Sequence, residues 1–288
     1  RRQSHLGTDG KDHQTVDGGF EMFRIALCQI AGSADKEQNR AKASEYIRKA
    51  AQGGTQIVSL PEMWNCPYSN DYFRKFAEPE DGASVKLMSE LAGELGIYLI
   101  GGTISELEDD KVYNTAYCFG KNGEIIGKHR KVHLFDIDIK GKIRFMESDT
   151  LTAGDSLTVI DTEFCKVGVA ICYDVRFPEW FRKMALEGAK LVFLPAAFNT
   201  TTGPAHWDLL MRSRALDNQV YFAANAPARD EHGIFRAYGN SCIADPWGEF
   251  VAHADEKECI IYGDIDIEKE ESIREQLPLL KHRRPELY

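Results

Sequence analysis

Cys172 ends an apolar run and stands a few residues before a proline suited to the start of a helix. The run 167–172 predicts a strand, and Pro178 fits the first turn of the helix that follows. Such a strand-to-helix turn would leave the sulfur at a sheet edge, with the Tyr173 backbone N–H able to hold an oxyanion and the helix dipole favouring the thiolate. Cys172 is therefore a candidate nucleophile. The alternative is one more buried core thiol, the better interpretation of any cysteine without this context.

A thiol nucleophile needs a base, and Glu62 is placed where a buried strand has just ended. It follows the proline that closes the predicted strand 56–60, so its carboxylate could project into a pocket at the sheet edge. The alternative is a solvated loop glutamate. Farther along, Lys128, Arg130 and Lys131 lie close together, and a solvated strand edge is their ordinary interpretation. Only one of these three cations would be wanted inside a catalytic pocket.

Short β-rich runs alternate with helical patterns from residue 23 onward. Strands separated by helices, without a Pro/Ser-rich linker, indicate one α/β layered domain from about residue 22 to 288. Two places are typical of hairpins: the pair of runs 112–119 and 125–128, and the segment 239–253. The other strands are expected at 23–30, 56–60, 97–101, 166–172, 191–194, 220–224 and 259–267, and helices at 36–52, 84–96, 177–188, 205–218 and from 268.

Composition excludes several classes of protein. The chain of 288 residues is 43% hydrophobic, which is enough for a sizeable packed core. A net charge of -10, with acids interspersed among the basic residues, predicts no nucleic-acid partner, and the longest apolar runs are too short to span a membrane. Seven cysteines without paired spacing indicate neither a disulfide framework nor a metal site. We expect a cytoplasmic protein.

Residues 1–21 are rich in Gly, Asp, Gln and His and lack apolar periodicity. This composition suits a flexible leader or an added extension, with Met22 as a natural start. These residues are left out of the fold prediction for that reason.

Three motifs, in this order, resemble the Glu-Lys-Cys triad of the nitrilase superfamily. Glu62 stands in Ser-Leu-Pro-Glu, Lys131 in His-Arg-Lys-Val-His-Leu, and Cys172 in Ile-Cys-Tyr-Asp-Val-Arg-Phe-Pro-Glu. The resemblance covers about residues 22–288 and implies a four-layer αββα sandwich that forms a homodimer or larger assembly through its helical faces. It also implies that Glu147, in Arg-Phe-Met-Glu-Ser, is the second glutamate that this family has near its pocket. No metal or organic cofactor is implied.

The resemblance also implies a reaction, the cysteine-dependent hydrolysis of a small amide to an acid and ammonia. Glu62 would take the thiol proton and Cys172 would attack the amide carbon, while Lys131 and the Tyr173 backbone N–H hold the oxyanion. Glu62 would then activate water to hydrolyse the thioester, with Glu147 orienting Lys131 or that water. A catalytically silent binding module is the alternative outside enzymology, and loss of a triad residue would favour it.

Further segments resemble the omega-amidase branch of the superfamily. This branch implies short dicarboxylates carrying one amide, such as alpha-ketoglutaramate or alpha-ketosuccinamate, as substrates. The segments are 65–68, 133–138 and 198–207, whereas the tail 281–288 is closer to the deaminated-glutathione amidases. A nitrilase or an N-carbamoyl amidohydrolase would use the same thiolate, so these alternatives stay open.

A substrate carboxylate requires donors at the far end of the pocket, where binding can orient the amide over the nucleophile. Tyr68, Arg130 and Arg176 are the nearest donors in sequence to the expected site residues. Phe198 is expected to form pocket wall or core. Arg176 is also expected to join Asp174 and Glu179 in an ion-pair network that braces the turn after the candidate nucleophile.

Overall fold

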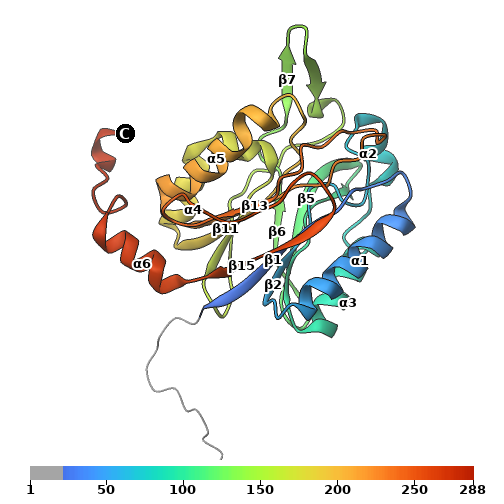
Figure 1. Cartoon of the computed structure of the whole chain (residues 1–288). Coiled ribbons are helices and arrows are strands. Elements are labelled where there is room, and N and C mark those ends of the chain that lie inside the picture. Colours follow the sequence, from blue (N-terminus) through green and yellow to red (C-terminus); the bar gives the residue numbers. More distant parts are fainter. Residues whose placement is uncertain (1–21) are drawn as a thin grey trace, which may run out of the picture.

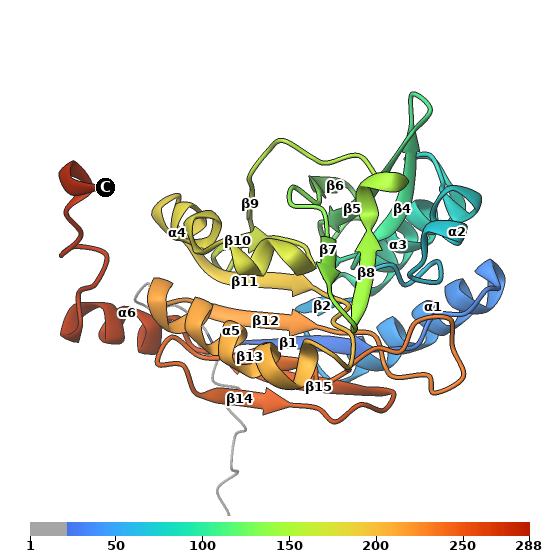
Figure 2. The same cartoon turned by 90° about the horizontal axis from the view of Figure 1, so that it is seen from above.

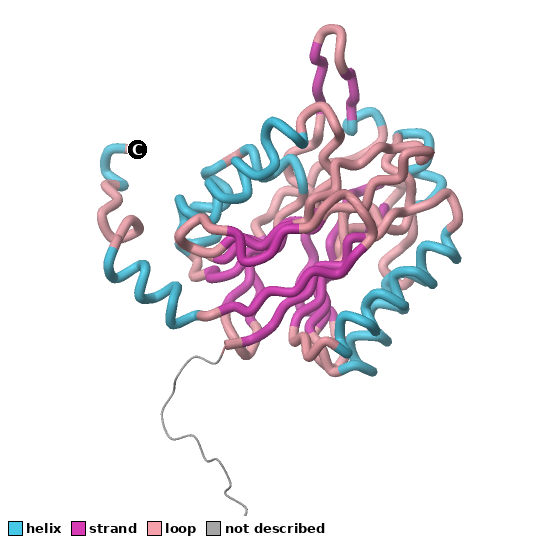
Figure 3. Tube along the Cα trace, viewed as in Figure 1, coloured by secondary structure: helices cyan, strands magenta, loops and turns pink. Residues whose placement is uncertain are grey.

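The computed structural model describes residues 22–288, so the expected leader at 1–21 lies outside the described residues. Two large sheets lie face to face, and helices cover the outer face of each sheet (Figures 1, 2 and 3). This is the four-layer αββα arrangement that the family resemblance implies.

Seven strands make the first sheet: β1 (Phe23–Gln29), β2 (Ile57–Ser59), β3 (Tyr98–Ile100), β4 (Ile104–Glu108), β5 (Lys111–Phe119), β6 (Ile125–Arg130) and β15 (Cys259–Ile265). Their order is β15-β1-β2-β3-β5-β4, and β6 pairs with β5. β1 runs parallel to β2 and antiparallel to β15. The C-terminal strand therefore closes the edge of the sheet beside the first strand of the chain.

Two helices of the first half form where their end signals predict. α1 (Lys36–Gln52) has the bounds expected from sequence, because the Asp35 side chain accepts hydrogen bonds from two N–H groups of the first turn and Gly53 follows the last one. α3 (Ala83–Leu95) ends at Gly96, whose φ of 63° is left-handed. Together α1 and α3 cover the outer face of the first sheet (Figure 1).

Alternation along β1 shows how the layers are held together. Ile25 and Leu27 pack between the two sheets in a core shared with the second sheet, whereas Ala26 and Cys28 pack against the outer helices. Since successive side chains of a strand point to opposite faces, one strand contributes to two apolar layers. Strands buried on both faces read as continuous apolar runs, which is why they could be located from sequence.

Six strands make the second sheet: β9 (Thr158–Asp161), β10 (Lys166–Val169), β11 (Ala189–Pro195), β12 (Tyr221–Asn225), β13 (Cys242–Ala244) and β14 (Phe250–His253). Their order is β14-β13-β12-β11-β10-β9. α4 (Pro178–Leu186) and α5 (Gly203–Asn218) cover its outer face. α6 (Ile267–Gln276) is hydrogen-bonded to the body through Arg274 and Gln219, and the tail that follows it runs away from the body (Figures 1 and 2). Across residues 22–288, no helix is both long and apolar enough to cross a bilayer.

Several short elements are absent from the sequence prediction. They are α2 (Asn70–Phe76), β4, β9, the hairpin of β7 (Asp136–Ile139) and β8 (Ile143–Met146), and the 3-10 turns η1 (Glu147–Asp149), η2 (Cys172–Arg176) and η3 (Pro285–Leu287). The β7–β8 hairpin projects from the body (Figure 1). Its apolar residues alternate with polar ones on either side of a glycine turn and pair across the hairpin, Ile137 with Phe145 and Ile139 with Ile143. The sequence prediction lacks the hairpin although this period-2 signal is present.

Candidate active site

The strand that leads to Cys172 ends earlier than predicted. β10 ends at Val169, and the 3-10 turn η2 (Cys172–Arg176) begins at the cysteine, whereas α4 begins only at Pro178. Cys172 has a φ of 44°, a left-handed conformation that is uncommon for residues with a side chain and that recurs at functional sites. The first N–H groups of a helical turn have no partner inside it. Tyr173 supplies one of these groups directly after the sulfur.

The Cys172 side chain is buried and neutral. It is only 4% exposed, and burial raises the pKa of its thiol well above the usual range, with a further increase from the Glu62 carboxylate. Burial outweighs the helix dipole that the sequence predicts to favour the thiolate, and α4 begins farther along the chain. Such a thiol needs a base at the moment of attack.

Asp174 fixes the turn that carries Cys172. Its buried carboxylate accepts hydrogen bonds from the Ile171 N–H at 2.9 Å, the His133 N–H at 3.0 Å and the ring nitrogens of His129 and His133. Burial opposes ionisation of Asp174, but hydrogen bonds from the two histidines hold its pKa below the ordinary value. The expected pairing of Asp174 with Arg176 is wrong, because the histidines occupy this carboxylate.

Glu62 is buried after the end of β2 and is held by three donors. Its Oε1 accepts from Asn114 Nδ2 at 2.7 Å and from Lys131 Nζ at 3.1 Å, and its Oε2 accepts from the Ala197 N–H at 2.6 Å. Burial raises the pKa of Glu62, and the Lys131 ammonium opposes this increase. The carboxylate is close enough to Cys172 for its charge to act on the thiol.

Lys131 lies between two buried carboxylates. Its Nζ is 2.8 Å from Glu147 Oε1 and 3.1 Å from Glu62 Oε1. Burial lowers the pKa of Lys131, but Glu147 and Glu62 outweigh that effect and raise the pKa above its ordinary value, so the ammonium stays charged. Glu147 is itself fixed, because the Phe135 N–H donates to its Oε2 at 2.7 Å and the Tyr68 hydroxyl donates to its Oε1.

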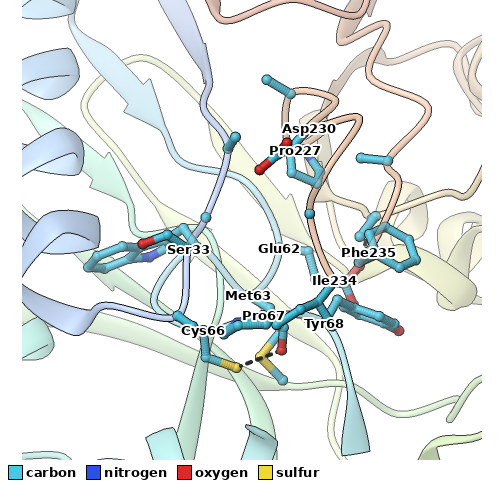
Figure 4. Close-up of a pocket in the computed structure, with 18 of the residues that line it drawn as sticks. Ser33, Glu62, Met63, Cys66, Pro67, Tyr68, Pro227, Asp230, Ile234 and Phe235 are labelled. Atoms are coloured by element: carbon cyan, nitrogen blue, oxygen red, sulfur yellow. Dashed lines mark hydrogen bonds between the residues drawn. The ribbon is translucent and has the colours of Figure 1, made fainter.

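Two cavities meet at Ala197 beside these residues. The larger one has a volume of about 240 Å³, has Glu62 and Tyr68 in its wall, and is built from the loops after β1, β2 and β12 (Figure 4). The smaller one is lined by Cys172 and Arg176. Loops at the carboxyl ends of parallel strands are where α/β sheets bind ligands. The smaller cavity is also lined by Phe135, Tyr173, Phe198, Asn199 and Thr202.

Of the two arginines expected to hold a carboxylate, Arg176 lies at the site and Arg130 does not. Arg130 donates to both oxygens of Glu106 at 2.9 Å and pairs with Glu108 at 2.7 Å. Burial opposes ionisation of Glu106, but hydrogen bonds from Arg130 and Lys128 lower its pKa to about 2. The assignment of Arg130 to substrate binding is therefore wrong.

Tyr68 lines the larger cavity and Phe198 lines the smaller one. The Tyr68 hydroxyl contacts Glu147, and its oxygen is 3.4 Å from Lys131 Nζ. Burial, with Glu147 next, raises the pKa of Tyr68 well above its ordinary value, so this hydroxyl keeps its proton. The Phe198 ring meets Trp207 edge to face at 5.1 Å between centroids and forms wall of the smaller cavity.

Three contacts at the site are not predicted by any sequence motif. Asn114 and the main-chain N–H groups of Ala197 and Phe135 each hold a carboxylate of the site. The available signal for Asn114 was a polar side chain within the apolar run 112–119. Main-chain donors leave no signal, since any residue type except proline supplies an N–H.

A buried thiol, a carboxylate and an ammonium together suit nucleophilic attack on a carbon that carries a polar multiple bond. The carboxylate can accept the thiol proton, and the ammonium can stabilise the oxygen or nitrogen that becomes negative. The closed surroundings strengthen both effects, because charges interact more strongly away from water.

Glu147→Gln is expected to lower kcat by about tenfold or more, because it removes the carboxylate nearest Lys131 and keeps the side-chain shape. Steady-state kinetics measures the effect. Glu106→Gln is the matched control, since Glu106 is also buried and paired with cations, and its kcat should stay within about threefold of the unaltered enzyme. A fully active Glu147→Gln enzyme would assign Glu147 to structure alone.

Comparison with known proteins shows which enzymes this chain is similar to. Residues 24–275 match the family described as carbon-nitrogen hydrolase. Omega-amidase NIT2 of Xenopus tropicalis is 52% identical over 92% of this chain and 96% of its own length, and human omega-amidase NIT2 is 50% identical with the same coverage. Saccharomyces cerevisiae Nit3, described as a member of branch 10 of the nitrilase superfamily, is 47% identical, has a TM-score of 0.85, and aligns over 91% of this chain and 97% of its own. These similarities confirm the resemblance that the three motifs indicate.

Proposed function

The chain belongs to the carbon–nitrogen hydrolase family, and from this premise we propose that it hydrolyses the terminal amide of a short dicarboxylic acid, as an omega-amidase does. Alpha-ketoglutaramate and alpha-ketosuccinamate are the substrates that fit this description. The names of the amphibian and human relatives support the proposal. The larger cavity, at about 240 Å³, lies below the usual range for drug-sized ligands and suits a small substrate.

Arg176 is the observation that carries the substrate class. Its guanidinium lines the same small cavity as Cys172, lies 5.2 Å from the centre of the Phe198 ring and is 3.3 Å from His206 Nδ1. Among residues 22–288 no carboxylate lies within ion-pair distance of it. A planar cation without a counterion beside the nucleophile suits the free carboxylate of a substrate.

The proposed reaction has two stages. Glu62 accepts the thiol proton as Cys172 Sγ attacks the amide carbon, and Lys131 with the Tyr173 N–H holds the oxyanion. Glu62 then gives the proton to the leaving nitrogen, so that ammonia departs and a thioester remains. In the second stage Glu62 removes a proton from water, water attacks the thioester, and the acid leaves as the Cys172 thiol recovers its proton.

Substrate charge is the test of this proposal. The kcat/KM for alpha-ketoglutaramate is expected to exceed that for an uncharged amide of similar length by about a hundredfold or more, because a cation left unpaired in the site penalises the neutral substrate. Arg176→Met should remove most of this difference. Arg48→Met, on an exposed pair with Glu94, is the matched control and should preserve it.

Other substrate classes would be recognised in the same assay. Equal values for the charged and neutral amides would contradict the proposal. A clear preference for deaminated glutathione, a nitrile or an N-carbamoyl acid would replace the substrate and leave the cysteine chemistry in place.

We also propose a homodimer built on the helical face. Exposed apolar side chains occur on α5 and on the hairpin beside it, with exposed fractions of 67% for Leu209, 41% for Leu216 and 53% for Trp247. Tyr288, 74% exposed, ends a tail that runs away from the body (Figure 1) and could cross to a second copy. Light scattering should give about twice the chain mass of 32.4 kDa, since such an interface is of the obligate type. The monomer mass at micromolar concentration would contradict it.

A reducing compartment such as the cytoplasm is the proposed location. All seven cysteines are free thiols, as is usual where glutathione and thioredoxin keep thiols reduced. Fractionation of cells that produce the protein would test the location.

A further inference from the structure

We propose that Asn114 is a positioning residue that sets the protonation of the catalytic base. The inference rests on the proposed role of Glu62 as that base and goes beyond it. Asn114 lies on β5 and is 0% exposed. Neither the three motifs nor their spacing assigns it a part in the reaction.

One residue connects two members of the triad. The Asn114 side chain donates from Nδ2 to Glu62 Oε1 at 2.7 Å, and its backbone carbonyl accepts the Lys131 N–H at 2.9 Å. Lys131 then reaches the same Glu62 oxygen at 3.1 Å. The two side chains are thus directed to one carboxylate oxygen from adjacent strands.

The donors around Glu62 leave one place for the transferred proton. Oε1 already accepts from Asn114 and Lys131, whereas among the described residues the Ala197 N–H is the one nitrogen donor to Oε2. The Cys172 thiol also hydrogen-bonds to the Glu62 carboxylate. Each carboxylate oxygen has about two acceptor positions. The proton removed from Cys172 therefore goes to Oε2, and Asn114 keeps Oε1 occupied.

The orientation of the Asn114 amide supports this role. Its Oδ1 is buried and has no hydrogen-bond partner among the described residues, an arrangement that costs stability. Turning the amide over would point Oδ1 at the Glu62 carboxylate and leave Nδ2 in the unpartnered position, which is worse while Glu62 is ionised. The fold therefore keeps an unsatisfied carbonyl in order to aim a donor at the base.

The charged and titratable groups that face Glu62 are Lys131, Glu147, Cys172 and Tyr68. A hydrogen bond to the ionised form of a carboxyl group favours that form. Loss of the Asn114 donor therefore raises the pKa of Glu62. The acid side of any rate profile that needs ionised Glu62 moves to higher pH.

The test compares Asn114→Leu with Asn218→Leu. Asn218 is the matched control, because it is also buried, donates to a backbone carbonyl at 2.9 Å and has an unpartnered Oδ1, but lies on α5 away from the triad. Two rates are followed against pH: alkylation of Cys172 by iodoacetamide, read by mass spectrometry, and kcat/KM for ammonia release. Alkylation needs no knowledge of the natural substrate.

Asn114→Leu is expected to move the acid side of both profiles upward by about one pH unit, with activity approaching that of the unaltered enzyme at higher pH. Asn218→Leu should lower Tm and leave both profiles in place. If Asn114→Leu does not fold, Asn114→Asp, which keeps the shape, should move the profiles in the same direction, since two carboxyl groups that share a site raise one pKa.

Glu62→Gln separates the possible failures. Suppose that Glu62→Gln abolishes the acid side of the alkylation profile. The inference is then overturned if the pH profiles of the Asn114 variants stay in place, or if these variants lose activity equally at every pH. An acid side that persists in Glu62→Gln would overturn the inference together with the proposed base.

Discussion

Cys172→Ala is expected to lower kcat by at least about ten-thousand-fold while the protein stays folded. Removing the nucleophile of an enzyme whose catalytic groups act as a unit has effects of this order or larger. Cys172 is buried at the start of η2, and alanine fills the same backbone position without a larger side chain. Ammonia release measured with a large excess of enzyme would detect the remaining rate, and Tm would report the fold.

Cys242→Ala is the matched control for this experiment. Cys242 is also a fully buried thiol, but it lies on β13 away from the triad. Its replacement should cost some stability and leave kcat within about threefold. Near-normal turnover in Cys172→Ala would return Cys172 to the class of structural thiols.

The second large effect is expected for Lys131→Met. Loss of one oxyanion donor elsewhere costs about 2.7 to 4 kcal/mol in the transition state, so kcat should fall by about a hundredfold or more. Stability should fall as well, because Glu62 and Glu147 would remain buried without the cation between them. Removing one partner of a buried ion pair lowers the free energy of unfolding by about 3 to 5 kcal/mol.

A double variant separates these two losses. Lys131→Met combined with Glu147→Gln removes one of the stranded charges, so it should recover part of the stability lost in Lys131→Met and none of the activity. Urea unfolding and steady-state kinetics measure the two quantities. Recovery of activity together with stability, or a fall in kcat under about threefold for Lys131→Met alone, would show that the lysine is structural.

The order and type of the main elements could be predicted because their signals are local. α1 has an Asp cap and a following glycine, and the central strands are buried on both faces. The β7–β8 hairpin also carries a local signal, since Ile137, Ile139, Ile143 and Phe145 alternate with polar residues around a glycine turn, but the prediction left it out. The strand before Cys172 was extended too far because an apolar run continues past Val169, where the chain has already left the sheet.

The residue types of the site could be predicted, but the directions in which their side chains point could be predicted less well. Lys128 and Arg130 both contact Glu106, whereas His129 and Lys131 are fully buried on the other face. Successive side chains of a strand point to opposite faces of the sheet, but only the packing of the two sheets decides which of these side chains face Cys172. Arg130 was assigned to the wrong face for this reason.

Contacts between distant parts of the chain account for the rest. Asn114 and Glu62 are 52 residues apart in sequence, and the Ala197 N–H meets Glu62 across 135 residues. No local spacing encodes such pairs. The burial that raises the pKa of the Cys172 thiol likewise comes from the meeting of two sheets, which a helix dipole considered alone does not take into account.

Mass spectrometry of the enzyme quenched during turnover is the most direct measurement of the proposed chemistry. With alpha-ketoglutaramate, a fraction of the chains should gain the mass of the substrate less that of ammonia, and the gain should map to the peptide that contains Cys172. Glu62→Gln should form little of this species, and Cys172→Ala should form none. Two results would contradict a thioester on Cys172. One is turnover with no covalent adduct in either the unaltered enzyme or Glu147→Gln. The other is an adduct on a different residue.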